Sequence, residues 1–328
     1  MKNKYLRFLF VLFFAAAVFS LLYLSFFLPQ LPKATEQYSV ILYQYTDNDW
    51  TSLLEGIRQA EEDEGVVVNY VTTSLEASPE NELELVKREI ENGAEGILLA
   101  PADSDILAKE IAQIAKNTPV ITLETGLGTE NADISGDNYG MGYLLGCQVA
   151  DDMQRADEKS VCIIKEYMER QSVQQRCQGF VDAIGEKLPE ALIQEYSRSE
   201  GDYNLPVCIA NMYLHGSSGI YIAALDKYCT EALIEAVSSS ESEPNNYLFR
   251  QRAYGIGNTE KTVSGLDAGL IRGLVYQNEF NMGYQGLQAL IQKKQNKKTE
   301  PNAEIKYYYV TQDTLYEPEN QRLLFPLK

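Results

Sequence analysis

Short apolar segments alternate with amphipathic segments along most of this chain, and this alternation constrains its fold more than any other feature. Residues 38–45 form an apolar, β-branched run, and residues 49–64 after it carry apolar side chains at helical spacing. The same pattern predicts further strands at 66–71, 95–100, 119–123, 160–165, 219–224, 247–255, 271–276 and 305–310, and further helices at 79–92, 104–116, 171–187, 226–237 and 278–294. Short, continuous apolar strands between helices indicate parallel sheets that are covered on both faces.

The strand and helix pattern occurs in two successive sets of similar size. A chain of 328 residues is also too long for one typical hydrophobic core. We therefore predict an α/β protein with two doubly wound, parallel-sheet lobes. Ligands of such sheets bind beyond the carboxyl ends of the strands, so two facing lobes would line one cleft.

The N-terminal segment predicts the compartment. Residues 5–28 are almost entirely apolar, with Arg7 as their one charge, and a helix of this length can span a bilayer core of about 30 Å. Lys2 and Lys4 precede the run, which favours a cytoplasmic N-terminus. A cleavable signal peptide is the alternative, although its apolar region is usually about 7–15 residues long. We predict a single-pass cell-membrane protein with an N-terminal transmembrane helix and its C-terminal domain outside.

Charge and cysteine content exclude several classes of function. The chain has 28 basic and 47 acidic residues, a net charge of −19, so we predict no nucleic-acid partner. Its five cysteines form no C-x-x-C pair, and the single His215 cannot complete a zinc site. Gly126 and Gly128 belong to no complete nucleotide motif. We predict no metal and no cofactor, and the thiols are either reduced or form one or two disulfides.

A series of short motifs lies at the expected strand ends. The motifs are Asp-Asn-Asp-Trp at 47–50, Gly-Ile-Leu-Leu-Ala-Pro-Ala-Asp-Ser at 96–104, Pro-Val-Ile-Thr-Leu-Glu at 119–124, Ser-Gly-Asp-Asn at 135–138, Arg-Cys-Gln-Gly-Phe at 176–180 and Ala-Leu-Asp at 224–226. In this order and spacing they resemble the ribose/galactose-type periplasmic sugar-binding proteins, whose type I periplasmic binding fold also forms the effector domain of lac-repressor-type regulators. The resemblance covers residues 38–310, nearly all of the part outside the membrane.

The resemblance implies two lobes joined by a hinge that the chain crosses three times. Residues 1–37 would be a cytoplasmic tip, the transmembrane anchor and a linker. Residues 38–136 and 279–308 would form the N-terminal lobe, and residues 137–278 and 309–328 the C-terminal lobe. The lobes would close over the ligand, and a partner would bind the closed form.

The resemblance also implies a set of ligand contacts. They are Asp47, Asp49, Trp50, Glu124, Arg176, Tyr203, Asp226, Asn258 and Gln277. The ring of Trp50 would stack on a sugar, and Arg176 would form a bidentate bond to ring or hydroxyl oxygens. At some positions the chain departs from the family pattern and lacks side chains that would bind the hydroxyl groups of a sugar. These positions are Ala100, Thr125, Leu225 and Gly257. A less hydroxylated or a cationic ligand is therefore an open alternative.

Simpler interpretations exist for four of these contacts. Asp47 and Asp49 could only cap the helix that follows, because Asp is a favoured N-cap residue. Trp50 could be a core residue of that helix, given its apolar neighbours. Arg176 could be a structural or surface arginine.

We therefore predict a membrane-anchored, extracytoplasmic solute-binding protein rather than an enzyme. It would close on a small, sugar-like ligand and present it to an ABC permease or to a sensor such as a histidine kinase. One alternative is an extracellular enzyme that acts on sugars, with Asp47, Asp49 and Glu124 supplying its carboxylate pair. The other is a ligand-free, receptor-like interaction domain.

Overall fold

The computed structural model describes residues 10, 12–20, 23, 36–44, 49–74, 78–128, 133–196, 204–215, 219–241, 243, 246–295 and 304–325. The chain divides into an N-terminal unit, residues 1–36, and a second unit, residues 37–328. In the N-terminal unit residues 12–20 are helical. No helix among the described residues combines the length and the apolar character that a membrane crossing needs. Much of the predicted anchor at residues 5–28 lies outside the described residues, so the anchor stays a prediction.

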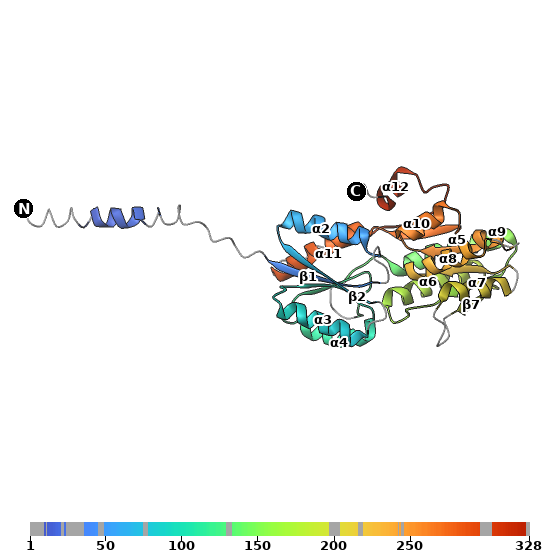
Figure 1. Ribbon diagram of the computed structural model, residues 1–328, viewed down its shortest axis with the longest axis horizontal. Coiled ribbons are helices and arrows are strands. Elements are labelled where there is room, and N and C mark those ends of the chain that lie inside the picture. Colours follow the sequence, from blue (N-terminus) through green and yellow to red (C-terminus); the bar gives the residue numbers. More distant parts are fainter. Residues whose placement is uncertain are drawn as a thin grey trace, which may run out of the picture. The chain divides into compact units, whose positions relative to one another are not determined.

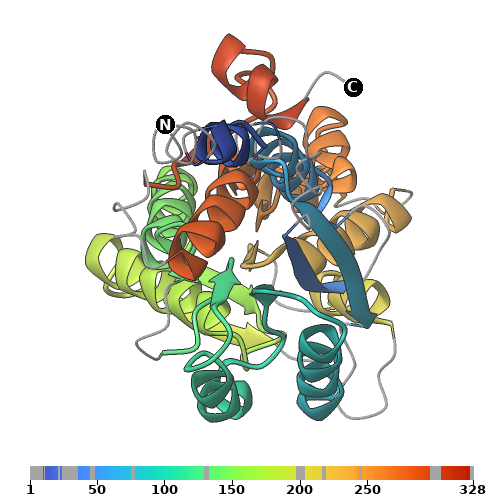
Figure 2. The ribbon, with the colours of Figure 1, turned by 90° about the vertical axis from the view of Figure 1, so that its left-hand side faces the viewer.

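The first sheet of the second unit has five parallel strands in the order β2-β1-β3-β4-β5. Their bounds are β1 Gln37–Gln44, β2 Val67–Ser74, β3 Ile97–Ala100, β4 Val120–Leu123 and β5 Asp133–Ile134. Helices α2 (Thr51–Glu64) and α11 (Glu279–Lys294) cover one face, and α3 (Pro79–Glu91) and α4 (Ser104–Ile114) cover the other (Figure 2). Leu98 packs toward the first helix pair and Leu99 toward the second, as the alternation of side chains along a buried strand requires.

The second sheet has six strands in the order β11-β10-β9-β8-β6-β7, and only β11 runs antiparallel to its neighbour. Their bounds are β6 Ser160–Ile164, β7 Leu192–Tyr196, β8 Tyr221–Ala224, β9 Ala253–Ile256, β10 Gly273–Gln277 and β11 Tyr307–Val310. The helices of this half are α5 Asn138–Ala156, α6 Gln171–Lys187, α7 Leu205–His215, α8 Lys227–Ser239, α9 Asn246–Arg252, α10 Glu260–Asp267 and α12 Pro318–Leu324 (Figure 1). Alternate strand residues again contribute to two separate cores, one that includes α5 and α6 and one that includes α7 and α8. The five cysteines, all among the described residues, carry free thiols.

The chain passes between the two sheets three times. It leaves the first sheet after β5, returns after β10 to form α11, and crosses again to form β11. The predicted α/β fold with parallel sheets is confirmed, while the predicted lobe boundaries stay a prediction. Those boundaries placed residues 279–308 in the N-terminal lobe, whereas pairing with β10 places Tyr307 and Tyr308 in the second sheet.

The structure differs from the local predictions at several elements, since β5, β7, α7, α10 and α12 were not predicted. The predicted strand at 247–255 is a helix followed by a short strand, α9 and β9, because Phe249 is fully buried and stacks on Tyr213 with ring centroids 3.9 Å apart. Helix α5 was not predicted, although Met141, Leu145 and Val149 recur at every fourth position, which is the spacing of a buried helix face.

Glycines on both helices let the backbones of α5 and α6 come into direct contact. A Cβ atom on Gly142 would collide with the carbonyl group of Arg176, and one on Gly179 would collide with that of Tyr139. The backbone of Arg176 is therefore held against α5. The first turn of α6 contacts the segments that follow strands of the first sheet, where the amides of Gln171 and Ser172 donate to the hydroxyl oxygens of Ser104 and Thr125.

Candidate ligand-binding cleft

The carboxyl ends of strands from both sheets line one narrow cavity with about 350 Å³ of space between atoms. Its lining residues lie at, or a few positions beyond, the ends of β1, β4, β6, β8, β9 and β10, except for Arg176, which lies within helix α6. They are Tyr43, Glu124, Arg170, Arg176, Asp226, Lys227, Ile256, Gly257, Asn258, Tyr276, Gln277 and Glu279. This is the position where parallel α/β sheets bind ligands.

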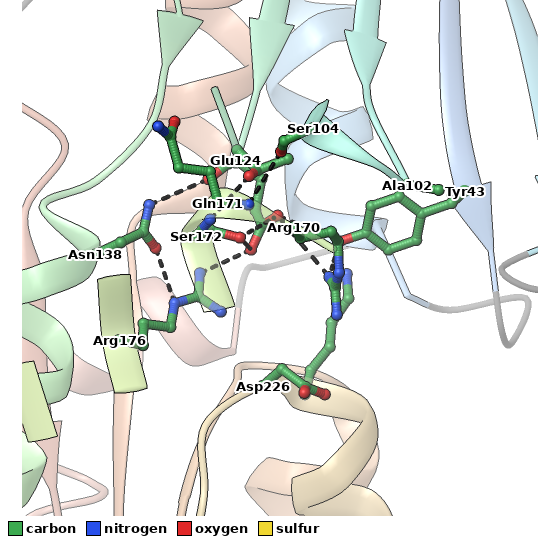
Figure 3. Close-up of polar contacts among 12 residues, drawn as sticks. Tyr43, Ala102, Ser104, Glu124, Asn138, Arg170, Gln171, Ser172, Arg176 and Asp226 are labelled. Atoms are coloured by element: carbon green, nitrogen blue, oxygen red, sulfur yellow. Dashed lines mark hydrogen bonds and ion pairs between the residues drawn. The ribbon is translucent and has the colours of Figure 1, made fainter. Parts of the chain in front are cut away.

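A buried ion pair joins the two halves of this cavity (Figure 3). Arg176 Nη2 from α6 donates to Glu124 Oε1, which follows β4, at 2.7 Å. Glu124 has a φ of +67°, a left-handed conformation that is rare for a residue with a side chain. Asn138 holds both partners, since it accepts from Arg176 Nε at 2.8 Å and donates to the carbonyl oxygen of Glu124 at 3.2 Å. The strained backbone of Glu124 is thus fixed by the same network that orients the arginine.

Arg170 forms a second arm of the network on the other side of Glu124. Its Nη1 donates to the hydroxyl oxygen of Tyr43 and lies 4.0 Å from Glu124 Oε2. The Tyr43 hydroxyl in turn donates to Glu124 Oε2 at 3.3 Å, and Ser172 Oγ lies 3.2 Å from each oxygen of that carboxylate. The Arg170 guanidinium also lies over the Tyr43 ring, 4.9 Å from its centroid.

The electrostatics of this network favour the charged form of Glu124. Burial alone would raise the pKa of this carboxyl, but the guanidinium groups of Arg176 and Arg170 outweigh burial and hold the pKa below its ordinary value. Burial raises the pKa of the Tyr43 hydroxyl, which stays protonated and able to donate. The cavity wall is therefore a paired, charged surface rather than an apolar one.

Lys227 makes a second connection between the halves. Its Nζ donates to the backbone carbonyl oxygen of Asp49 at 2.7 Å and lies 3.3 Å from the centroid of the Trp50 ring. The indole Nε1 of Trp50 donates to the carbonyl oxygen of Tyr43 at 2.5 Å, which fixes the ring. Burial lowers the pKa of Lys227, and burial raises the pKa of the neighbouring Glu279. The aromatic face at the start of α2 is thus covered by an ammonium group.

Three polar atoms of the cavity wall lack a partner among the described residues. They are Asp226 Oδ2, Arg170 Nε and Gln277 Oε1. These residues are buried, with exposed fractions of 1% for Asp226, 2% for Arg170 and 7% for Gln277. The other oxygen of Asp226 caps α8, accepting from the Cys229 amide at 2.9 Å. Buried polar groups nearly always have a hydrogen-bond partner, so unsatisfied atoms that line one cavity point to a bound molecule.

The structure places the predicted contact residues in three groups. Five of them line the cavity: Glu124, Arg176, Asp226, Asn258 and Gln277. Asp49 lines an adjoining cavity with Tyr43, Arg170 and Asp226, and Trp50 is 2% exposed beneath Lys227. Asp47 and Tyr203 lie outside the described residues. The ligand-contact roles of all nine stay a prediction.

Seven lining residues were not among the predicted contacts. They are Tyr43, Arg170, Lys227, Ile256, Gly257, Tyr276 and Glu279. Each lies within a few residues of the carboxyl end of a strand or a hinge crossing, and that position is a usable signal. The resemblance alone did not single them out.

Residues 38–298 match the family model described as periplasmic binding protein domain, and the chain belongs to this family. The predicted resemblance is confirmed, and so is the prediction of a binding protein rather than an enzyme. No sequence among the curated proteins matches this chain.

Solved structures of the same fold cover most of the chain. A carbohydrate transporter solute-binding protein from Agrobacterium radiobacter, in complex with D-arabinose, has a TM-score of 0.78 and 21% identity, and the match covers 89% of this chain and 99% of that one. An ABC transporter solute-binding protein from Agrobacterium vitis, bound to α-D-tagatopyranose, has a TM-score of 0.76 and 15% identity, over 89% and 100% of the two chains. A glucose-galactose binding protein from Geobacillus stearothermophilus has a TM-score of 0.71 and 22% identity, over 86% and 100%.

Proposed function

We propose that this chain is an exported solute-binding protein whose two lobes close on a small, sugar-like ligand. The observation that carries the proposal is the set of unsatisfied atoms of Asp226, Arg170 and Gln277 in one buried cavity. Two of these atoms are acceptors and one is a donor, so the ligand would supply at least two O–H or N–H groups and one acceptor. Adjacent hydroxyl groups of a sugar meet this requirement.

The cavity is nearly closed in this structure. Of the about 350 Å³ between its atoms, only about 20 Å³ is open to a water-sized molecule, far less than the about 300–1,000 Å³ of usual small-molecule sites. Side chains from both lobes already contact each other across it, as Glu124 and Arg176 do at 2.7 Å. A ligand would therefore enter when the lobes separate and would be enclosed when they close.

The comparisons support a role in solute uptake. The structural relatives from Agrobacterium are solute-binding proteins of transporters with a bound monosaccharide. On this basis an ABC permease is the proposed partner, and a histidine kinase sensor remains the second candidate. Tethering by the apolar residues 5–28 would keep the domain outside the cell and beside either partner.

A thermal-shift screen of the full-length protein against monosaccharides, polyols and amino sugars tests the proposal. We expect a saturable rise in Tm with at least one sugar-like compound, and recovery of that compound unchanged. Asp226→Ala and Arg170→Ala should each abolish most of the shift. Lys261→Ala is the control: it removes only the surface ion pair between Lys261 and Glu235, whose charged atoms lie 3.1 Å apart, and should leave the shift unchanged. No shift with any compound, or its chemical conversion, would contradict the proposal.

A further inference from the structure

The Lys227 ammonium occupies a site with the chemistry of an amine receptor. It lies 3.3 Å from the centroid of the Trp50 ring and donates at 2.7 Å to the carbonyl oxygen of Asp49. The carboxylates of Glu279 and Asp49 also attract it. An aromatic face, a carbonyl oxygen and nearby carboxylates are the groups with which proteins recognise organic ammonium ions.

The two sides of this contact come from different lobes. Trp50 and Asp49 stand at the start of α2 over the first sheet, and Lys227 begins α8 over the second sheet. Separation of the lobes would therefore withdraw the lysine and leave the ring face and the carbonyl oxygen of Asp49 open. When the lobes close again, any ligand ammonium would compete with Lys227 for the same place.

A larger groove beside this site has the matching charge. It shares Asp49, Asn258 and Glu279 with the cavities described above and lies between α2, α10 and α12. Five carboxylates line it, and no lysine or arginine occurs among its described lining residues. The carboxylates are those of Asp49, Glu55, Glu260, Asp267 and Glu279. A groove with one sign of charge attracts counter-ions, so it favours the approach of a cation.

We propose that the ligand carries a primary amine, whose ammonium replaces Lys227 on the Trp50 ring in the liganded protein. Lys227 then serves as an internal competitor that fills the ammonium site while the cleft is empty. The ligand class is a small amine with several hydroxyl groups, such as an amino sugar. This assignment rests on the proposed function, because it specifies the ligand of the same cleft.

Chemical rescue tests the ammonium site without knowledge of the natural ligand. Lys227→Ala removes the internal ammonium, and n-butylammonium has the charge and the four carbons of a complete lysine side chain, one carbon more than the part that alanine lacks. Trp50 is the only tryptophan, so its emission reports occupancy of the site. We expect saturable emission changes with n-butylammonium in the variant, and at least about tenfold weaker changes with neutral n-butanol. Equal responses to the two compounds, or no response to either, would overturn the ammonium site.

Matched sugars test the ligand class in the full-length wild-type protein. Calorimetry would compare D-galactose, D-galactosamine and D-galacturonate, and the corresponding glucose series. We expect each amino sugar to bind about tenfold or more tightly than its neutral parent. Neutral or acidic sugars that bind as tightly as the amino sugars would overturn the amine inference while leaving the proposed function intact. Binding of n-butylammonium by the alanine variant with no binding of any sugar would instead refute the sugar-like ligand and keep the ammonium site.

Discussion

Arg176 Nη2 lies 2.7 Å from Glu124 Oε1, and this buried pair joins a helix over the second sheet to a strand end of the first. Both residues are nearly fully buried, at 3% and 5% exposure. Opening of the lobes would separate the two groups and hydrate them. The pair therefore contributes to the closed conformation rather than to the stability of either lobe.

Glu124→Gln should shift the protein toward the open conformation. Removal of one partner from a buried ion pair costs about 3–5 kcal/mol, because the arginine stays buried without its countercharge. Three amide groups near the cleft report closure, since Ser104, Gln171 and Ser172 each donate a hydrogen bond across it, at 2.9, 3.0 and 2.9 Å. Their hydrogen exchange should accelerate in the variant, while exchange within β3 and β6 should not change.

The exposed residue Glu84, on α3, provides the control for this experiment. Glu84→Gln changes the net charge by the same amount and should leave the three amides protected. Equal protection of the cleft amides in the wild type and in Glu124→Gln would show that the ion pair does not hold the lobes closed.

Gly179→Ala should destabilise the protein by about 1–3 kcal/mol, the usual cost of an overpacked contact. The added methyl group collides with the Tyr139 carbonyl and pushes α6 away from α5. Gly185→Ala on the same helix is the matched control, because nothing lies within 4 Å of its Cβ position. That control should gain up to about 1 kcal/mol from helix propensity. Urea unfolding of both variants measures the difference, and equal stabilities would contradict the close helix contact.

Glu82 should make stability fall as the pH rises from 4.5 to 7. Burial raises the pKa of this carboxyl from 4.5 to about 7, so in this window the folded protein binds a proton that the unfolded chain has released. The free energy of unfolding should drop by about 3 kcal/mol across the window. Glu82→Gln should remove this slope, and Glu84→Gln should keep it. Urea unfolding at pH 5, 6 and 8 would refute the prediction if the slope survived in Glu82→Gln.

Arg170→Ala should weaken ligand binding by about 1.5–3 kcal/mol, the value of a hydrogen bond to a charged group. Its Nε is unsatisfied among the described residues of the cavity, so a ligand acceptor would be its partner. Calorimetry with the compound that gives the largest thermal shift measures the loss. Arg88→Ala, at an exposed position on α3, is the control, and an equal affinity in both variants would remove Arg170 from the site.

The alternation of strands and helices could be predicted because hydrophobic periodicity is a local property of the chain. The predicted helix at 171–187 coincides with α6 to the residue. The strand at 247–255 was wrong because three aromatic residues favour a strand, while burial of Phe249 against Tyr213 favours the helix α9. Tertiary packing of this kind cannot be seen in a window of a few residues.

The site was predictable only where the family pattern marks a residue. Glu124 and Asp226 follow strand ends, Arg176 lies in α6, and all three line the cavity. Arg170 was missed because its function depends on Tyr43, which is 127 positions away in the sequence and adjacent only in the fold. The Trp50 ring was identified, but its coverage by Lys227 depends on contact between the two lobes.

The central claim is that a small ligand binds in the cleft between the two lobes. The most direct measurement titrates the full-length protein with its tightest sugar-like ligand and follows calorimetric heat and Trp50 emission in parallel. Trp50 lies beside Tyr43 and Lys227 at the cleft, with the Tyr43 ring centroid 5.1 Å from its own. Binding in the cleft predicts a saturable emission change with the same Kd as the heat. Calorimetric binding with unchanged Trp50 emission would place the ligand elsewhere and contradict the account.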